Sequence, residues 1–414
     1  MVARYPLRCD GCGANIRLRL QVGHDKNHPF AFECRQCHQV IRGVHVLGKP
    51  PKTYLRELAG AKKESGDPDP DQSVTLSPDF LWDGDPSPDA FSPFLHTFNR
   101  LGAELAMAQM ARARMFTQIA SDIAPPLQRA IRNYESGDDR RLVAILREHV
   151  GDPPGDTPAG RLQALHRLAV VAMSPVAASP PHIRVMMQFH QLPIRASRHN
   201  PKAYERLLQE SRDKGLVAEL ELTNLKLIPR IYDLRSEFLP VLVDWDVRHP
   251  EVDIPPHLLF GRVGRFDEAK SLYVDAYEAV MRSLTAITAV CNVLERRNHD
   301  AYPPYPDRSI RRAKSMMDFH RQNHAPKLSL LAGIAVLRGW PGVALEPNLR
   351  NAIGHNSASL DMLGEKLSYT ASRKGGKVTL SYANFLVRVL RAVNAAHEAN
   401  QILRLVRAQE LSLP

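Results

Sequence analysis

The stretch "LRNAIGHNS" (residues 349–357) places an arginine and a histidine five positions apart, with an asparagine directly after the arginine. The same Arg-x4-His spacing also occurs at Arg19 and His24, and again at Arg161 and His166. A chain with 17 histidines and 55 lysines and arginines produces such matches by chance, so the spacing alone identifies no site. The surrounding sequence has to separate the three.

The elements around residues 349–357 predict a helical bundle. Apolar residues recur at intervals of three and four residues over 266–297, which indicates one long amphipathic helix. A second helical span over 309–337 starts basic and is expected to break at Pro326. A short helix beginning at Pro347, a hairpin over 365–382 that turns at its two adjacent glycines, and a last helix over 383–411 complete the order. This order predicts a four-helix bundle with a β insertion.

The middle of the chain, residues 91–250, also reads as helical. Helices are expected from residue 91 to about 124 and near 127–149, 158–173, 201–213 and 216–243, with Pro- and Gly-rich segments between them. The methionines of the first span (Met107, Met110 and Met115) lie on an apolar stripe and are expected to pack in a core. We assign no chemistry to this region.

The first 50 residues contain four of the five cysteines. Two C-x2-C pairs each lie beside an alternating apolar run, which predicts short strands around two metal-binding turns. A closed tetrahedral shell of four thiolates leaves no position for water, so the zinc would be structural. The predicted ligands are Cys9, Cys12, Cys34 and Cys37; His24, His28 and His38 lie nearby but are not needed to complete the shell.

Charge and composition limit the class of partner. The net charge is +11, and residues 64–90 hold eight acidic residues with no Lys or Arg, which leaves the rest at +19. Such a basic chain suits nucleic acid, although a basic surface that serves solubility alone is the other interpretation. The Pro- and Asp-rich residues 51–90 are expected to form a flexible or extended linker. No secretory signal and no membrane span are visible, which favours a cytoplasmic protein.

Residues 260–410, centred on "LRNAIGHNS", resemble the HEPN superfamily of helical bundles. Many members carry Arg, a polar residue and then His on the third helix, followed by a hairpin and a long last helix. Here these positions are Arg350, Asn351 and His355, whereas the two other Arg-x4-His matches lie in the cysteine-rich segment and in a helix without a following hairpin. The resemblance implies a metal-independent endoribonuclease that works as a homodimer, often in phage defence or as a toxin. Some relatives serve only as binding modules.

The chemistry of these residue types fits RNA cleavage by the ribose 2′-hydroxyl. Histidine can move the proton, a contribution of roughly 10²–10⁴-fold in rate, and a guanidinium offsets charge on the phosphate without losing its own proton. On an unbroken helix the two side chains would point about 140° apart, so we expect local distortion near Gly354, or pairing across a dimer. A basic run is expected to hold RNA by its phosphates, or to be simply an exposed helix face: Arg308, Arg311, Arg312, Lys314 and Arg321.

The sequence therefore predicts a mainly α protein in four parts. These are a zinc ribbon (1–50), an acidic linker (51–90), a helical middle region (91–250) and a HEPN-like bundle (255–414). The leading functional hypothesis is an RNA-cleaving enzyme with structural zinc and no catalytic cofactor. The ribbon would bind nucleic acid or a partner protein. The alternatives are a non-catalytic adaptor that dimerises through the bundle, and a DNA-binding regulator that uses the ribbon.

Overall fold

The computed structural model describes residues 2–413 except 25, 49–51, 67, 84–91, 154, 178, 263, 306–309, 332, 339, 362 and 372–374. The chain divides into two compact units. Unit 1 comprises Met1–Thr117, Leu234–Ala269 and Pro347–Val387, and unit 2 comprises Gln118–Asp233, Lys270–Glu346 and Arg388–Pro414. The division falls within three helices: α2 (Ala103–Asp122), α10 (Phe266–Arg296) and α14 (Tyr382–Glu410). The units therefore do not follow the contiguous boundaries predicted from the sequence.

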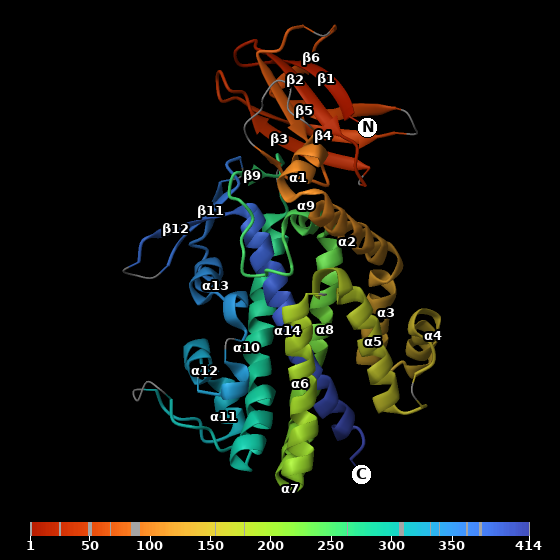
Figure 1. The fold of residues 1–414 in the computed structure, drawn as a ribbon, viewed down its shortest axis with the longest axis vertical. Helices are drawn as coiled ribbons and strands as arrows, with labels where there is room; N and C mark the ends of the chain where they lie inside the picture. The colour runs from red at the N-terminus through yellow and green to blue at the C-terminus, as the bar shows by residue number, and fades with distance from the viewer. Residues whose placement is uncertain are drawn as a thin grey trace. The chain divides into compact units, whose positions relative to one another are not determined.

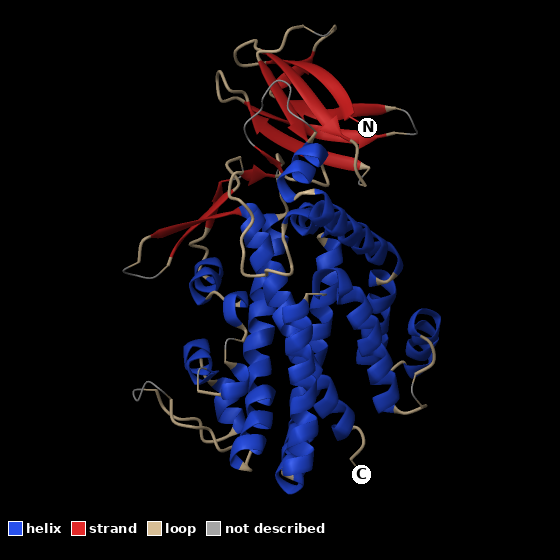
Figure 2. Ribbon diagram, in the orientation of Figure 1, coloured by secondary structure: helices blue, strands red, loops and turns tan. Residues whose placement is uncertain are grey.

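The N-terminal part of unit 1 consists of two small sheets, shown red in Figure 2. The first has the order β6-β1-β2-β7, and the second has the order β3-β4-β5. Side chains alternate between core and surface as predicted, because Ile16, Leu18 and Phe30 point into one shared apolar core. The strands are β1 (Val2–Cys9), β2 (Asn15–Gln21), β3 (Asn27–Glu33), β4 (Val40–Leu47), β5 (Thr53–Ala59), β6 (Ala61–Lys63) and β7 (Gln72–Leu76).

The expectation of a linker over 51–90 is wrong for the residues of that range that the structure describes. Strands β5, β6 and β7 complete the two sheets, and β7 pairs in parallel with β2 from Ile16↔Gln72 to Leu20↔Leu76. One of its acidic residues contacts the start of β2, because Asp71 Oδ2 accepts a hydrogen bond from Asn15 N at 2.8 Å. A short strand β8 (Trp82–Asp83) pairs with β9 (Leu258–Leu259). Residues 84–91 lie outside the described residues.

The rest of unit 1 combines short helices with a three-stranded sheet. It includes α1 (Pro93–Leu101), α9 (Arg235–Asp244), α13 (Pro347–Gly354) and a meander of β10 (Ser359–Asp361), β11 (Lys366–Thr370) and β12 (Lys377–Ser381). The predicted hairpin over 365–382 is therefore present. The predicted core position of the α2 methionines is wrong for Met107 and Met115, which are 60% and 38% exposed.

Unit 2 is helical, and its helices are drawn blue in Figure 2. The sequence predicts a Pro-rich connection between residues 173 and 201, whereas the structure has the long helix α6 there, which begins at the double proline 180–181. Ser179 caps this helix and the prolines occupy its first turn, where their missing N–H groups cost nothing. Its helices are α3 (Ala124–Ser136), α4 (Asp139–Val150), α5 (Pro158–Ala177), α6 (Pro180–His199), α7 (Pro201–Lys214), α8 (Leu216–Asp233), α11 (Met316–Arg321) and α12 (His324–Leu331), with parts of α2, α10 and α14.

The predicted order of elements after residue 266 is present in the structure. Figure 1 shows α10, the short α11 and α12, then α13, β11 and β12, and finally α14. The break expected at Pro326 comes slightly earlier, because α11 ends at Arg321 and Pro326 lies in the first turn of α12. Among the described residues, no helix is both long and apolar enough to cross a bilayer. The fold is thus mainly α with a small N-terminal β part.

Candidate functional site

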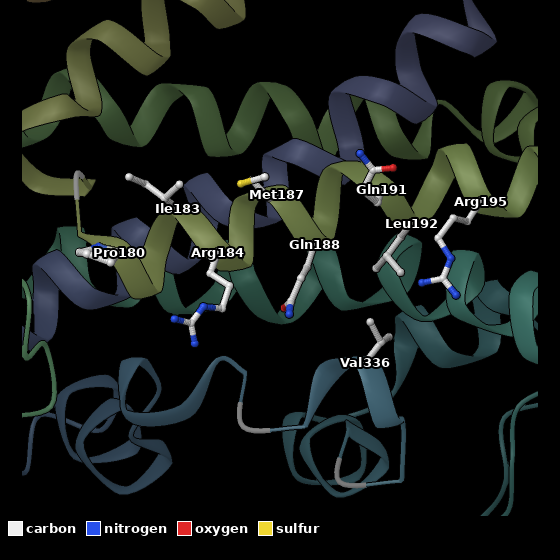
Figure 3. Close-up of a pocket in the computed structure, with 9 residues that line it drawn as sticks. All are labelled: Pro180, Ile183, Arg184, Met187, Gln188, Gln191, Leu192, Arg195 and Val336. Atoms are coloured by element: carbon white, nitrogen blue, oxygen red, sulfur yellow. The ribbon is translucent and has the colours of Figure 1, made fainter.

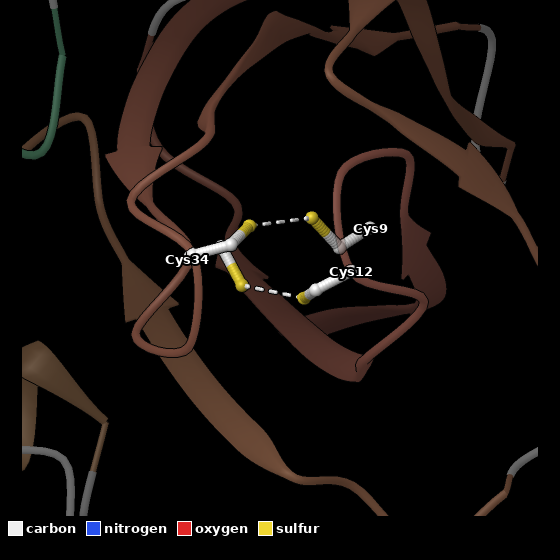
Figure 4. A group of neighbouring side chains, drawn as sticks. Cys9, Cys12 and Cys34 are labelled. Carbon is white, nitrogen blue, oxygen red and sulfur yellow. Dashed lines mark hydrogen bonds between the residues drawn. The ribbon is translucent and has the colours of Figure 1, made fainter.

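The four predicted zinc ligands come together between the β1–β2 and β3–β4 turns. Figure 4 shows three of them, Cys9, Cys12 and Cys34. Cys9 Sγ lies 3.6 Å from Cys37 Sγ, and Cys12 Sγ lies 3.6 Å from Cys34 Sγ. A tetrahedral zinc with Zn–S bonds of about 2.3 Å requires sulfurs about 3.8 Å apart. All four sulfurs lie within 4.8 Å of one another, so the donor set fits a structural zinc ion.

The two cysteine turns have the same backbone geometry. In the first, the N–H of Gly13 donates to Cys9 O at 3.0 Å; in the second, the N–H of His38 donates to Cys34 O at 2.8 Å. Both residues that follow the second cysteine are left-handed, with φ of 78° at Gly13 and 59° at His38. The shared turn directs the thiols toward one point, and glycine adopts its left-handed conformation with less strain than histidine.

The nearby histidines do not join the shell. His38 is exposed and its Nδ1 lies 3.3 Å from Glu33 Oε2, while His24 Nδ1 pairs with Asp79 Oδ2 at 2.9 Å. His28 is buried in the sheet core, and burial lowers its pKa to about 3 with a further contribution from Arg262. The all-cysteine set is therefore the one that the geometry supports.

The sheet that carries the first cysteine turn has a basic outer face, which the sequence analysis did not identify. Because Tyr5, Leu7, Ile16 and Leu18 fill the core, the arginines between them lie on the opposite side. Arg4 pairs across the strands with Arg19, and Arg8 with Lys62. We call the set Arg4, Arg8, Arg17, Arg19 and Lys62 the basic sheet face.

Like charges directly opposite on a sheet destabilise it. Burial lowers the pKa of Arg19, and the charges of Arg4 and Arg17 lower it further. The basic sheet face is therefore a region where positive side chains lie close together. The signal for it in the sequence was the alternation "IRLRLQ" at residues 16–21.

Of the predicted catalytic residues, Arg350 and Asn351 lie in the middle of α13, and His355 directly follows its last residue; all three belong to unit 1. Arg350 is half-buried, and Asn351 and His355 are exposed. Arg350 Nη1 donates to Asn351 Oδ1 at 3.3 Å, and a Cβ placed at Gly354 would lie 3.6 Å from the same nitrogen. The guanidinium therefore extends along the helix toward its end, where the His355 imidazole has no hydrogen-bond partner among the described residues.

The end of α13 follows ordinary capping rules. Asn356 is left-handed with φ of 52°, Ser357 N donates to Ala352 O at 2.8 Å, and Asn356 N donates to Ile353 O at 3.1 Å. This is the Schellman arrangement, in which the left-handed residue satisfies the last helical carbonyls. The distortion expected near Gly354 is wrong, since the helix continues through Gly354 and turns at Asn356.

The basic run is not in the same unit as these three residues. Arg311, Arg312, Lys314 and Arg321 are exposed and belong to unit 2, whereas α13 belongs to unit 1. Arg308 lies outside the described residues. Among the described members of the run, only Arg321 is in a helix, so the run is no continuous helix face.

Of the other two Arg-x4-His matches, the one in unit 2 is structural. Arg161 forms ion pairs with Asp139 and Asp156, and His166 is buried against Glu221. Comparison of the chain with protein-family models, with curated proteins and with solved structures gives no match.

Two further features were not visible in the sequence. Glu365, at the start of β11, is buried and accepts hydrogen bonds from the N–H groups of Phe260 and Gly261. These hydrogen bonds anchor the meander that follows α13 to another segment of unit 1. Burial raises the pKa of Glu365 to about 7 despite these bonds.

The second is a pocket of about 800 Å³ in unit 2, beside α6 (Figure 3). The described residues that line it include Arg184, Met187, Gln188, Leu192, Arg195 and Val336.

Proposed function

We propose that the protein is a metal-independent endoribonuclease of the HEPN type. In this proposal His355 moves the proton between the ribose 2′-hydroxyl or the leaving 5′-oxygen and solvent, and Arg350 offsets the charge on the phosphate oxygens. Asn351 orients Arg350 through the hydrogen bond at 3.3 Å. The cleaved RNA would carry a 2′,3′-cyclic phosphate, and phage defence or a toxin-type stress response is the proposed setting.

The observation that carries the proposal is the position of the Arg350 guanidinium beside the end of α13. Arg350 Nη1 lies 3.6 Å from a Cβ built at Gly354, the residue that precedes His355, and the His355 side chain is exposed. The basic sheet face belongs to the same unit and supports binding of the RNA backbone, because phosphates attract Arg and Lys whatever the base sequence. The homodimer and a second motif facing the first are part of the proposal.

The test is cleavage of end-labelled RNA by the zinc-loaded full chain with EDTA added just before the assay. Arg350→Ala and His355→Ala should each abolish cleavage, with His257→Ala, an exposed histidine of unit 1, as the matched control. A 2′,3′-cyclic phosphate end that disappears in both variants supports the proposal. Equal cleavage by all four proteins, or no cleavage by the parent chain, contradicts it.

One observation favours a second function, a non-catalytic nucleic-acid-binding adaptor. Catalytic imidazoles are usually oriented by a third group, and His355 has no such hydrogen bond among the described residues. The adaptor would bind through the basic sheet face and dimerise through the helices. Tight RNA binding that is lost in an Arg17→Ala, Arg19→Ala variant, without any cleavage, would favour it. Preference for duplex DNA over RNA would favour the DNA-binding regulator instead.

A further inference from the structure

A second group of metal-ligand side chains lies in unit 2, away from the cysteines in sequence. Glu210 is on α7, and His299 and Asp300 follow the C-terminal end of α10. His299 Nε2 lies 2.8 Å from Glu210 Oε2 and 3.6 Å from Asp300 Oδ2. One ligand atom of each lies within 4.8 Å of the others. The ends of α10 and α7 lie together in Figure 1, and Asn200 Nδ2 donates to Val293 O between them.

His299 and Asp300 are held by surrounding groups. His299 is 6% exposed, and its carbonyl accepts a hydrogen bond from Asn292 Nδ2 at 3.0 Å. Asp300 Oδ1 accepts from the N–H of Met316 at 2.6 Å, which leaves Oδ2 directed at the imidazole. The Glu210 and Asp300 side chains are each 31% exposed, so the group is open to solvent on one side.

The charge of the group is not balanced by the protein. Two carboxylates share one imidazole, and no Lys or Arg among the described residues pairs with Glu210 or Asp300. A cation between the carboxylates would neutralise their negative charge.

We propose that Glu210, His299 and Asp300 bind a divalent transition-metal ion, Mn²⁺ or Zn²⁺, in a site separate from the cysteine shell. Metal–ligand bonds of about 2.1 Å place neighbouring donors about 3.0 Å apart in octahedral and about 3.4 Å apart in tetrahedral geometry. The two pairs that include His299 have observed distances of 2.8 and 3.6 Å, on either side of these values, and all three ligand atoms lie within 4.8 Å of one another. One imidazole nitrogen and two carboxylates are ligands that suit Mn²⁺ or Zn²⁺, whereas four thiolates suit softer metal ions.

The exposed side of the two carboxylates leaves coordination positions for water. The ion would link α7 to the segment between α10 and α11, two parts of the chain that are 89 residues apart at the Glu210–His299 contact. The site is independent of the proposed RNA cleavage, which is tested in EDTA. If the metal site is not found, the proposed RNA cleavage is unaffected, and if RNA cleavage is not found, the metal site is unaffected.

The test is Mn²⁺ binding to the full chain loaded with one equivalent of zinc, which fills the cysteine shell and leaves the second site open, measured by the loss of the free-ion EPR signal. The parent chain should bind one Mn²⁺, and Glu210→Gln and Asp300→Asn should each weaken binding by more than about tenfold. Glu205→Gln, which removes an exposed carboxylate from the same helix, should bind as the parent does.

A thermal-shift series completes the test, because Mn²⁺ should raise the unfolding temperature of the parent and of Glu205→Gln only. Circular dichroism without Mn²⁺ checks that the variants are folded, and Asp300→Asn retains the oxygen that accepts from Met316. No binding by the parent, or equal affinities in the parent and both ligand variants, overturns the proposal.

Discussion

His28 is expected to make the stability of the N-terminal sheets depend on pH. It lies directly across from His45 on β3 and β4, points into the core beside Phe30, and neither of its ring nitrogens has a hydrogen-bond partner among the described residues. Burial, together with the charge of Arg262 and the neighbouring His45, lowers its pKa from 6.5 to about 3. Burial also lowers the pKa of His45.

The direction of the pH dependence follows from which state, folded or unfolded, binds a proton at His28 more tightly. The folded state keeps His28 neutral, while the unfolded chain binds a proton below its ordinary value of 6.5. The contribution to stability is complete above pH 6.5 and is lost as the pH falls toward about 3. Relative to pH 7, protonation of His28 lowers the free energy of unfolding by about 2 kcal/mol at pH 5 and by about 4 kcal/mol near pH 3, because each pKa unit corresponds to about 1.4 kcal/mol.

The assay is urea unfolding of the parent and of His28→Leu between pH 7 and pH 5, both with zinc. Leucine fills similar volume without a titrating group, so the variant should lose about 2 kcal/mol less than the parent over this range. Acid also weakens zinc binding by protonating the cysteines, but this effect is common to both proteins and cancels in the difference. His257→Leu, at an exposed position, should follow the parent. Parallel pH profiles for the parent and His28→Leu would refute the reasoning.

Three further outcomes are expected in the N-terminal part. Cys34→Ser should lose the zinc and the protease resistance of the two sheets, because a structural zinc contributes on the order of 10 kcal/mol to folding; a zinc-loaded, resistant variant would contradict this. His38→Gly should stabilise by about 1 kcal/mol, and Gly13→Ala destabilise by a similar amount, because both positions are left-handed; equal urea midpoints would exclude the effect. Arg17→Ala should reduce the salt dependence of RNA affinity by about one unit of slope, and an unchanged slope would remove the basic sheet face from the interface.

The elements after residue 266 could be predicted because each is long or locally marked. The periodicity of α10 and α14 and the two glycines between β11 and β12 are visible without knowledge of tertiary contacts. The cysteine site was also predictable, since each turn carries two ligands three residues apart. What these signals share is that they lie within one segment.

The errors come from segments whose structure depends on distant partners. Residues 72–76 form β7 because β2 provides a parallel edge more than fifty residues earlier, and local Asp and Pro content does not reveal this. The start of α6 was misread for a different reason, since Ser179 followed by two prolines is a helix beginning as well as a break. The basic sheet face requires the register that sets Arg4 opposite Arg19, and the Glu210–His299 contact requires the packing of α7 on α10.

The geometry of α13 also changes how the arginine–histidine pair should be understood. An unbroken helix separates positions five apart by about 140°, which suggested that the backbone had to distort. The helix is regular through Gly354, and the Arg350 side chain extends along it, with Nη1 3.6 Å from a Cβ built at Gly354. A phosphate bound there would face the C-terminal end of the helix, whose partial negative charge opposes an anion. The guanidinium is therefore needed to hold the phosphate at all, before it stabilises any transition state, and a lysine with a single point charge would not reproduce its forked donors.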